Sequence, residues 1–331
     1  MMKSMTGKEK FFWISYGIGL TFLFLLSSTD LIIKEEEAKV HPISVIVEAD
    51  SDDNYVNFRK GMDLAAVELN ADVNFITLYE KGNRRQQEEL LKREQQDGSS
   101  ALIVAPVNGE AVLAMQEENQ LVLPLVFINS ETVGEPGTGK TAAVTFDYFT
   151  MGEKLGKEIA AVRSPNEKLY FLENEAMSVA GRKFMEGIRS GAAEGSEGPA
   201  ASYAWALEAE KGKILEKLTE GWTQKIILVA PEPESLLEAA QMLEDIEGAK
   251  EWVTGLYGRG SSVPILNFLD KGIIKGLCIT DDFSAGYLSV KAAIELAEGG
   301  AVQTGNYLDS YFIRRGDLRD EKYEKILYPV E

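Results

Sequence analysis

The chain alternates short apolar runs with polar turns and amphipathic stretches from residue 43 to near its C-terminus. The first example is the apolar run 43–47, which is followed by a stretch with helical periodicity over 54–69. This alternation predicts parallel βαβ units rather than a sandwich or a helical bundle. Ligands of open α/β sheets gather at the carboxyl ends of the strands, so functional residues are expected in the turns directly after the apolar runs.

The same pattern continues along the chain and predicts two similar βα arrays, which suggests two lobes with a cleft between them. The predicted strands cover 43–47, 73–78, 101–105, 123–128, 142–146, 169–172, 201–205, 225–229, 252–257 and 274–279. The predicted helices cover 54–69, 85–96, 110–119, 148–162, 180–190, 209–218, 235–247, 263–269 and 285–297.

The N-terminus contains an uncharged apolar segment, 11–28, which is preceded by Lys3, Lys8 and Lys10 and followed by acidic residues. Such a segment can cross a bilayer, and lysines on its leading side keep that side cytoplasmic. A cleaved signal peptide is the alternative, but the residues at 27–29 form a poor cleavage site and no cysteine is present there to accept a lipid. We therefore expect an uncleaved anchor with the rest of the chain outside the cytoplasm.

Composition excludes several classes of function. The net charge of −19 would repel nucleic acid and anionic lipid surfaces. Cys278 is the only cysteine and His41 the only histidine, which excludes an internal disulfide framework, multi-histidine metal sites and catalysis by histidine elsewhere. No cofactor is expected.

Short motifs in the predicted units resemble those of the type I periplasmic binding proteins, the ribose- and galactose-binding group. They are DSDDNY at 50–55, FRKG at 58–61, AA at 65–66, Asp147 with Gly152 and Gly156, Arg182 with EGI at 186–188, VTG at 253–255, LDKG at 269–272, and TD at 280–281 with Gly286. Each motif alone is weak, whereas their order and spacing together are specific. The resemblance covers nearly the whole extracytoplasmic part, and no helix-turn-helix precedes it.

The resemblance implies an α/β fold with two Rossmann-like lobes, whose parallel sheets are joined by a hinge, after one N-terminal transmembrane helix. The expected organisation is a cytoplasmic tail over 1–10, an anchor over 11–33 and a linker over 34–42. The first lobe would comprise 43–146 and 281–309, and the second lobe 147–280 and 310–331. A small polyhydroxylated ligand would be enclosed between the lobes when the hinge moves.

The resemblance also implies which side chains would contact a ligand. Asp52, Asn54 and Tyr55 would serve the first lobe, together with Asn129 and Ser130. Arg182 would reach in from the second lobe, and Thr280 or Asp281 would lie near the hinge. An ordinary helix start is the alternative interpretation of Asn54 and Tyr55, and a solvated helix face is the alternative for Arg182.

Two positions depart from the family pattern. APEP at 230–233 stands where sugar binders typically carry Asn-Asp, and GLY at 255–257 stands where they carry Gly-Phe-Asp. A proline side chain forms no hydrogen bond, and Tyr257 offers a phenol in place of a carboxylate. Either the ligand is not a simple pentose or hexose, with Trp205, Tyr257 and Arg259 reshaping the cleft, or the cleft has lost its ligand.

GEPGTGKT at 134–141 matches the phosphate-binding loop pattern, and LCITDD at 277–282 could serve as its acidic strand. That pattern requires a helix that begins at Lys140 and Thr141, whereas the residues that follow are typical of a strand. We therefore expect a solvated turn, and an ATPase or hydrolase is the weakest hypothesis because no nucleophile–base pair is evident.

The leading hypothesis is a membrane-anchored solute-binding protein that binds a sugar or polyol and is not an enzyme. Its partner would be a sensor histidine kinase or an ABC transporter permease, and the anchor favours sensing because it would hold the module beside one partner. The alternative is an interaction protein with a degenerate cleft that binds another protein.

Overall fold

The computed structural model describes residues 7–28, 39–130, 140–173, 177–193, 201–204, 225–246, 248–302 and 307–329. The chain divides into two compact units, Met1–Val40 and His41–Glu331. The predicted helix 209–218 and the candidate residue Trp205 lie outside the described residues.

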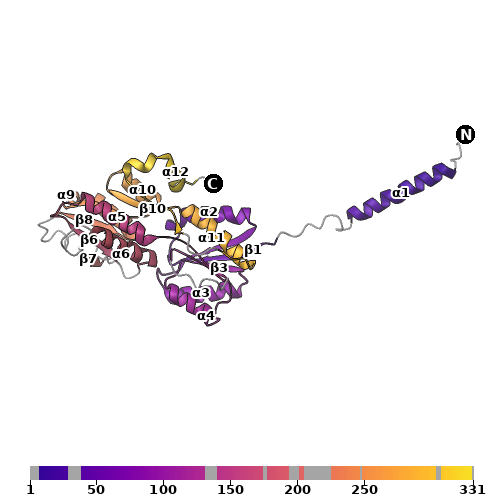
Figure 1. Cartoon of the computed structure of the whole chain (residues 1–331), viewed down its shortest axis with the longest axis horizontal. Helices are drawn as coiled ribbons and strands as arrows, with labels where there is room; N and C mark the ends of the chain where they lie inside the picture. Colours follow the sequence, from indigo (N-terminus) through magenta and orange to yellow (C-terminus); the bar gives the residue numbers. More distant parts are fainter. Residues whose placement is uncertain are drawn as a thin grey trace. The chain divides into compact units, whose positions relative to one another are not determined.

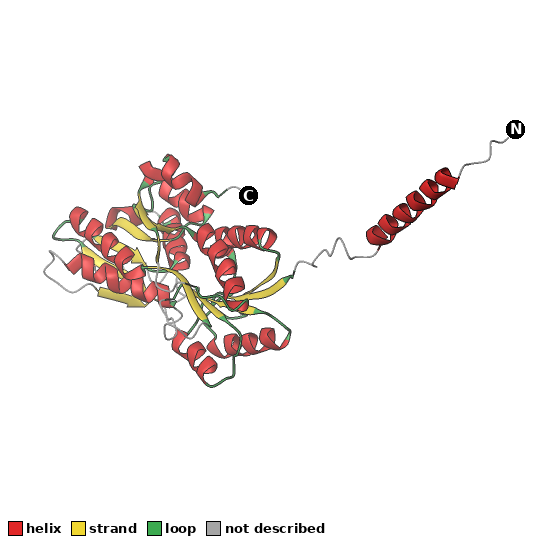
Figure 2. Cartoon of the chain, turned by 45° about the vertical axis from the view of Figure 1, so that its right-hand side comes forward, coloured by secondary structure: helices red, strands yellow, loops and turns green. Residues whose placement is uncertain are grey.

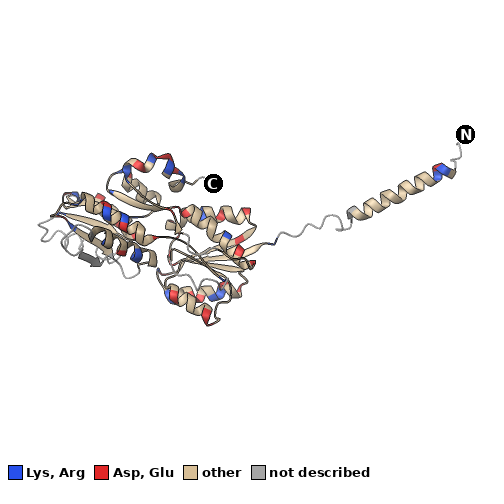
Figure 3. Cartoon of the chain, in the orientation of Figure 1, with Lys and Arg blue, Asp and Glu red and all other residues tan. Residues whose placement is uncertain are grey.

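The first unit contains one helix, α1 (Gly7–Ser28), among its described residues. Its segment Gly7–Leu26 is long and apolar enough to cross a membrane, a property that a signal sequence shares. The charged residues of α1 lie at its N-terminal end (Figure 3). The helix begins earlier than the predicted anchor 11–33, and residues 29–33 fall outside the described part.

The second unit contains two sheets (Figure 1). The first has the order β11-β5-β4-β3-β1-β2, and all of its strand pairs are parallel. Its strands are β1 (His41–Ile46), β2 (Ala71–Ile76), β3 (Ala101–Val104), β4 (Leu125–Ile128), β5 (Thr141–Phe146) and β11 (Tyr307–Leu308). The second sheet has the order β12-β10-β9-β8-β6-β7 and is parallel except for its edge strand β12. Its strands are β6 (Lys168–Glu173), β7 (Ala201–Ala204), β8 (Ile226–Ala230), β9 (Val253–Arg259), β10 (Gly276–Thr280) and β12 (Ser310–Ile313).

Helices cover both faces of each sheet (Figure 2). The first sheet with α2 (Val56–Glu68), α3 (Arg84–Gln96), α4 (Gly109–Glu117) and α11 (Asp282–Ala297) forms the first lobe. The second sheet with α5 (Tyr148–Val162), α6 (Val179–Ala193), α8 (Pro233–Asp245), α9 (Ala249–Trp252), α10 (Val263–Asp270) and α12 (Glu321–Leu327) forms the second lobe. Two short 3-10 turns, Asp53–Tyr55 and Arg315–Arg319, complete the described elements. The predicted α/β class with parallel sheets is therefore confirmed.

Strand β1 shows why a parallel strand reads as a continuous apolar run. Val45 packs in the core cluster that contains Met62 of α2, while the next residue, Ile46, packs in the cluster that contains Leu91 of α3. Successive side chains point to opposite faces of a strand, so a strand covered on both faces needs apolar residues at every position.

The chain crosses between the lobes at three described places, and an aspartate lies at each one. Asp147 joins β5 to α5, Asp281 joins β10 to α11, and Asp309 joins β11 to β12. Asp147 and Asp281 accept hydrogen bonds from Thr150 N and Ser284 N, so each caps the helix that begins on the other side of the crossing. A helix cap at a crossing fixes the point at which a new rigid element begins.

Two motif glycines are explained by helix packing rather than by ligand contact. A Cβ atom placed on Gly61 of α2 would lie 1.9 Å from the carbonyl oxygen of Phe283, and one on Gly286 of α11 would lie 1.9 Å from that of Phe58. Both distances are far shorter than van der Waals contact, so only glycine allows α2 and α11 to approach this closely.

The phosphate-loop hypothesis is rejected by the local structure. Residues 134–139 lie outside the described part, but Thr141 begins strand β5. A helix N-terminus is required at this position to bind phosphate, so the sequence match carries no nucleotide site.

Candidate ligand site between the lobes

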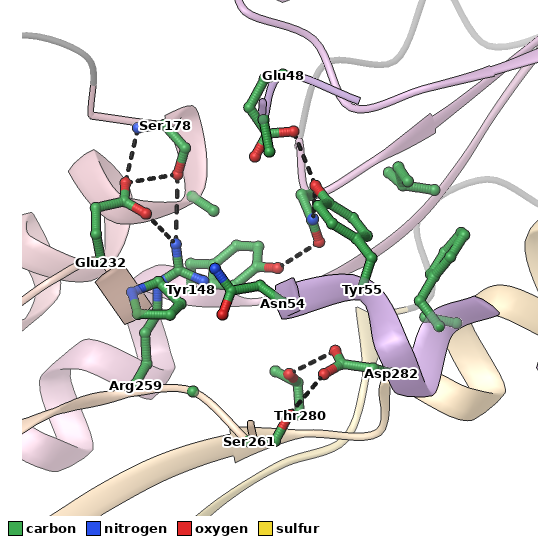
Figure 4. Close-up of a pocket in the computed structure, with 18 of the residues that line it drawn as sticks. Glu48, Asn54, Tyr55, Tyr148, Ser178, Glu232, Arg259, Ser261, Thr280 and Asp282 are labelled. Atoms are coloured by element: carbon green, nitrogen blue, oxygen red, sulfur yellow. Dashed lines mark hydrogen bonds and ion pairs between the residues drawn. The ribbon is translucent and has the colours of Figure 1, made fainter. Parts of the chain in front are cut away.

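A cavity of about 70 Å³ lies where the carboxyl ends of the two sheets face each other (Figure 4). Its walls come from both lobes, and it is lined by Glu48, Ala49, Asn54, Tyr55, Phe58, Ile128, Asn129, Tyr148, Ser178, Ala180, Glu232, Pro233, Glu234, Arg259, Gly260, Ser261, Cys278, Thr280, Asp282 and Ala285. This is the place in the fold where ligands of open α/β sheets are expected.

A chain of hydrogen bonds connects the first-lobe wall to the start of α5. The Tyr55 hydroxyl donates to Glu48 Oε2 at 2.8 Å, and Asn129 Nδ2 donates to the Tyr55 oxygen at 3.2 Å. Tyr148 donates in turn to Asn129 Oδ1 at 2.8 Å, so the chain of bonds passes from one lobe to the other. Asn129 directly follows β4 and has a φ of 53°, a left-handed conformation that asparagine tolerates better than most residues.

The second-lobe wall is built on a buried ion pair. Glu232 Oε2 accepts from Arg259 Nη2 at 3.0 Å, while its Oε1 accepts from the amide and the hydroxyl of Ser178 at 2.7 and 2.8 Å. Arg259 Nε also donates to the Pro231 carbonyl at 2.7 Å, and the guanidinium lies 5.4 Å from the centre of the Tyr148 ring. Both charged side chains are nearly enclosed, with exposed fractions of 5% for Glu232 and 15% for Arg259.

Asp282 forms the floor of the cavity near the crossing from β10 to α11. Thr280 Oγ1 donates to its Oδ1 at 2.7 Å, and Ser261 Oγ donates to its Oδ2 at 3.0 Å. Figure 4 shows Asp282 on the opposite side of the site from Glu48, with Glu232 and Arg259 on a third side.

The mouth of the cavity is bridged from lobe to lobe. Lys81 Nζ of the first lobe lies 2.8 Å from Glu234 Oε1 of the second, and Asn54 Nδ2 donates to the same oxygen at 3.0 Å. Outside this bridge is a groove of about 570 Å³, which Asn54 and Glu234 also line. Asn54 and Glu234 therefore stand between the cavity and the groove and line both.

Burial controls the ionisation of two cavity carboxyls. Removal from water raises the pKa of Glu48 to about 7, against hydrogen bonds that favour its charged form. Burial likewise raises the pKa of Asp282 to about 6, against the hydrogen bonds from Thr280 and Ser261. Burial also disfavours the charged form of Glu234, but the Lys81 ammonium beside it leaves the pKa of that carboxyl below its usual value.

Four of the ten residues expected to contact a ligand line the cavity: Asn54, Tyr55, Asn129 and Thr280. Five others are described but do not line it. Asp52 pairs with Arg59, and Ser130 is buried after β4. Asp281 caps α11, and Tyr257 is buried in the core cluster that contains Phe171.

Arg182 is the fifth, and its position departs most from the prediction. Its side chain is exposed on α6, and Nη1 donates to the carbonyl of Met177 in the segment that precedes that helix. The cavity arginine is Arg259, at the end of β9, which the sequence analysis associated only with a reshaped cleft.

Sequence reasoning missed the other carboxylate- and hydroxyl-bearing residues that line the cavity, namely Glu48, Tyr148, Ser178, Glu232, Glu234, Ser261 and Asp282. Four of them follow the strand-end rule, because Glu48, Tyr148, Glu232 and Asp282 each stand two residues after the end of a strand, β1, β5, β8 and β10 respectively. The departure APEP at 230–233 therefore supplies a carboxylate that lines the cavity, in place of the expected Asn-Asp. Within the described residues, no group of three or more metal-ligating side chains could hold a metal ion.

A family model described as a periplasmic binding protein domain matches residues 43–301, which is most of the chain. The chain belongs to the periplasmic binding protein family. The predicted resemblance is confirmed by this match and by a large number of solved structures with the same fold. No curated protein sequence matches this periplasmic binding protein significantly.

Similar solved structures include a glucose-galactose binding protein from Geobacillus stearothermophilus, with 17% identity and a TM-score of 0.71 over 85% of this chain and 99% of that chain. A solute binding protein from Bacillus halodurans with bound myo-inositol has 19% identity and a TM-score of 0.70 over 88% and 99%. A carbohydrate transporter solute binding protein from Agrobacterium radiobacter, in complex with D-arabinose, has 16% identity and a TM-score of 0.74 over 87% and 98%. At this identity the likeness shows the shared fold.

Proposed function

We propose that the chain is an extracytoplasmic solute-binding protein, not an enzyme, that closes on a small sugar-like ligand between its lobes. The observation that carries the proposal is the cavity lining, in which hydroxyl, amide, carboxylate and guanidinium groups from both lobes converge beside two tyrosine rings. Sugar rings are recognised by such a combination, because polar groups bond the hydroxyls and aromatic rings contact the apolar face. Family membership and the sugars and polyols named for similar structures support the same choice.

Ligand entry would require the lobes to part. The cavity of about 70 Å³ is smaller than the roughly 300–1,000 Å³ of typical small-molecule pockets. The crossings at Asp147, Asp281 and Asp309 are the proposed hinge, and they support the expected division into lobes near these residues.

The proposal includes a membrane anchor and a fixed partner. Helix α1 is long and apolar enough to span a bilayer, and lysines lie at its N-terminal end. An anchored module is held beside one partner, which favours a sensor kinase over an ABC permease as the recipient of the signal.

A protein-binding role with a degenerate cleft is the second candidate. It is supported by the small cavity and by the direct bonds of Lys81 and Asn54 to Glu234, which hold the lobes together through the chain's own side chains.

The test is a thermal-shift screen of the full chain in detergent micelles against pentoses, hexoses, polyols and cyclitols. A ligand at a hundred times its dissociation constant adds about 2.7 kcal/mol to folding stability, which raises the melting temperature by about 2–8 °C. Asn129→Ala should abolish the response, whereas Lys183→Ala on the exposed side of α6 should retain it. A screen without any response would favour the degenerate cleft.

Topology is tested separately with protease added to intact cells. An uncleaved anchor with an external globular part predicts that the domain is removed from the membrane fraction. A protected domain would overturn the orientation, and a domain free in the medium would indicate a cleaved signal sequence.

A further inference from the structure

The cavity has more negative than positive groups in its walls. Four carboxyl side chains line it, from Glu48, Glu232, Glu234 and Asp282, and Arg259 is the only cationic side chain among the lining residues. Lys81 adds a second cation at the mouth through its contact with Glu234. The net charge of the cavity wall next to a ligand therefore depends on which carboxylates are paired with these two cations.

Both cations are already committed to a specific carboxylate. Arg259 contacts Glu232 at 3.0 Å within the second lobe, and its Nε is bound to the Pro231 carbonyl. Lys81 contacts Glu234 Oε1 at 2.8 Å, which leaves Glu234 Oε2 as a buried oxygen without a hydrogen-bond partner. A ligand that carried a carboxylate or phosphate would have to displace one of these pairs.

Glu48 and Asp282 lie on opposite sides of the cavity and belong to neither of these two ion pairs. Within the described part of the chain, neither residue takes part in an ion pair, and the side-chain donors to both carboxyls are hydroxyls of tyrosine, threonine and serine. A neutral sugar would add further hydroxyl donors but no positive charge. An ammonium group would supply charge-assisted hydrogen bonds, which are roughly twice as strong as neutral ones.

We propose that the cleft selects a cationic sugar-like ligand, an amino sugar or an aminocyclitol, over the neutral parent compound. The inference deepens the proposed function and rests on it. The ammonium would lie against Glu48 or Asp282, while the ring hydroxyls would bond Asn129, Tyr148 and Arg259. Lys81 already places one ammonium group against this acidic lining, so the site accepts that chemistry.

The test compares matched pairs that differ at one group: glucose with glucosamine, galactose with galactosamine, and mannose with mannosamine. Calorimetric titration of the full chain in detergent should give at least one pair in which the amino sugar binds about tenfold more tightly. Glu48→Gln and Asp282→Asn keep the side-chain shape and remove the charge, so one of them should reduce the preference to near unity. Lys183→Ala is the control and should preserve it.

The outcomes separate the two proposals. If neutral sugars bind as tightly as their amino counterparts, or if neither isosteric variant changes the ratio, the inference fails and the proposed function stands. If the pairs and the wider thermal-shift screen both give no binding, the proposed function fails. N-acetylglucosamine separates charge from size, because equal binding of this uncharged derivative and glucosamine would also overturn the inference.

Discussion

The ammonium nitrogen of Lys81 lies 2.8 Å from Glu234 Oε1, and this ion pair joins the first lobe to the second across the mouth of the cavity. Lys81 follows β2, whereas Glu234 belongs to the first turn of α8. The lobes are thus joined beside the cavity by an ion pair between the chain's own side chains.

We expect Lys81→Met to favour separated lobes, because the closed form loses an attraction that the open form does not make. A partly buried pair of this kind should contribute about 1–2 kcal/mol to closure, roughly a tenfold change in the ratio of open to closed molecules. Small-angle scattering should detect a larger radius of gyration. Lys271→Met is the matched control, since Lys271 contacts Glu244 at 2.7 Å within one lobe. An unchanged radius in the Lys81 variant would show that the pair does not hold the lobes.

The raised pKa of Glu48, about 7 against 4.5 in a free peptide, predicts that stability falls with increasing pH. The folded state binds the proton of Glu48 more tightly than the unfolded state does. The contribution of Glu48 to the free energy of unfolding is therefore complete below about pH 4.5 and is lost as the pH rises through about 7. Its size is about 3 kcal/mol at 1.36 kcal/mol per pKa unit. Asp282, with a pKa of about 6, acts in the same direction at lower pH.

Urea unfolding between pH 4.5 and 8 measures this dependence. Glu234, whose pKa is lowered, has the opposite effect: its contribution to stability is lost as the pH falls, and this happens below the pH range of the experiment. Lys81, Glu232 and Tyr55 are the groups that face Glu48, and the Lys81 ammonium, whose pKa is raised by the carboxylates around it, keeps its charge across the window. Glu48→Gln should therefore flatten the upper part of the profile. A variant with the same slope as the native chain would contradict the assignment.

Helix packing provides a prediction that is independent of the ligand. Gly286→Ala places a methyl group 1.9 Å from the Phe58 carbonyl oxygen, so α2 and α11 must move apart. Overpacking of this kind should destabilise the fold by about 3 kcal/mol in urea unfolding. Gly316→Ala serves as the control because nothing lies within 4 Å of the added atom, and its effect should stay within about 0.5 kcal/mol.

The α/β class could be predicted from the sequence because parallel strands that are buried on both faces appear as short, continuous apolar runs. Strand β5 was predicted at 142–146 and occupies Thr141–Phe146, and the helix after it was predicted with the observed bounds, Tyr148–Val162. The edge strand β12 and helix α12 went unpredicted. Three of the four residues of β12 are only partly buried, so its pairing with β10 is set by tertiary contact rather than by an apolar run.

The cavity residues that could be predicted from the sequence are residues that lie at the end of a strand or follow it. Asn54, Tyr55 and Asn129 follow β1 and β4 and were identified, whereas Arg182 was placed by analogy with a family position. The residues next to an arginine in the sequence do not show whether its side chain lies exposed on a helix or pairs with a buried glutamate in a cleft. That difference depends on Glu232 and Arg259, which are far apart in the chain and meet only because β8 and β9 are neighbours.

The two arginines give the last prediction. Arg259→Ala leaves the buried Glu232 without the cation that compensates its charge, and should destabilise the protein by about 3–5 kcal/mol. Arg182→Ala removes an exposed side chain and one bond to a backbone carbonyl, and should cost less than about 1 kcal/mol. Urea unfolding of both variants measures the contrast. Adding Glu232→Gln to Arg259→Ala should recover much of the loss, because the uncompensated charge is then absent. Equal losses for the two arginines, or no recovery in the double variant, would show that the buried pair does not stabilise the second-lobe wall of the cavity.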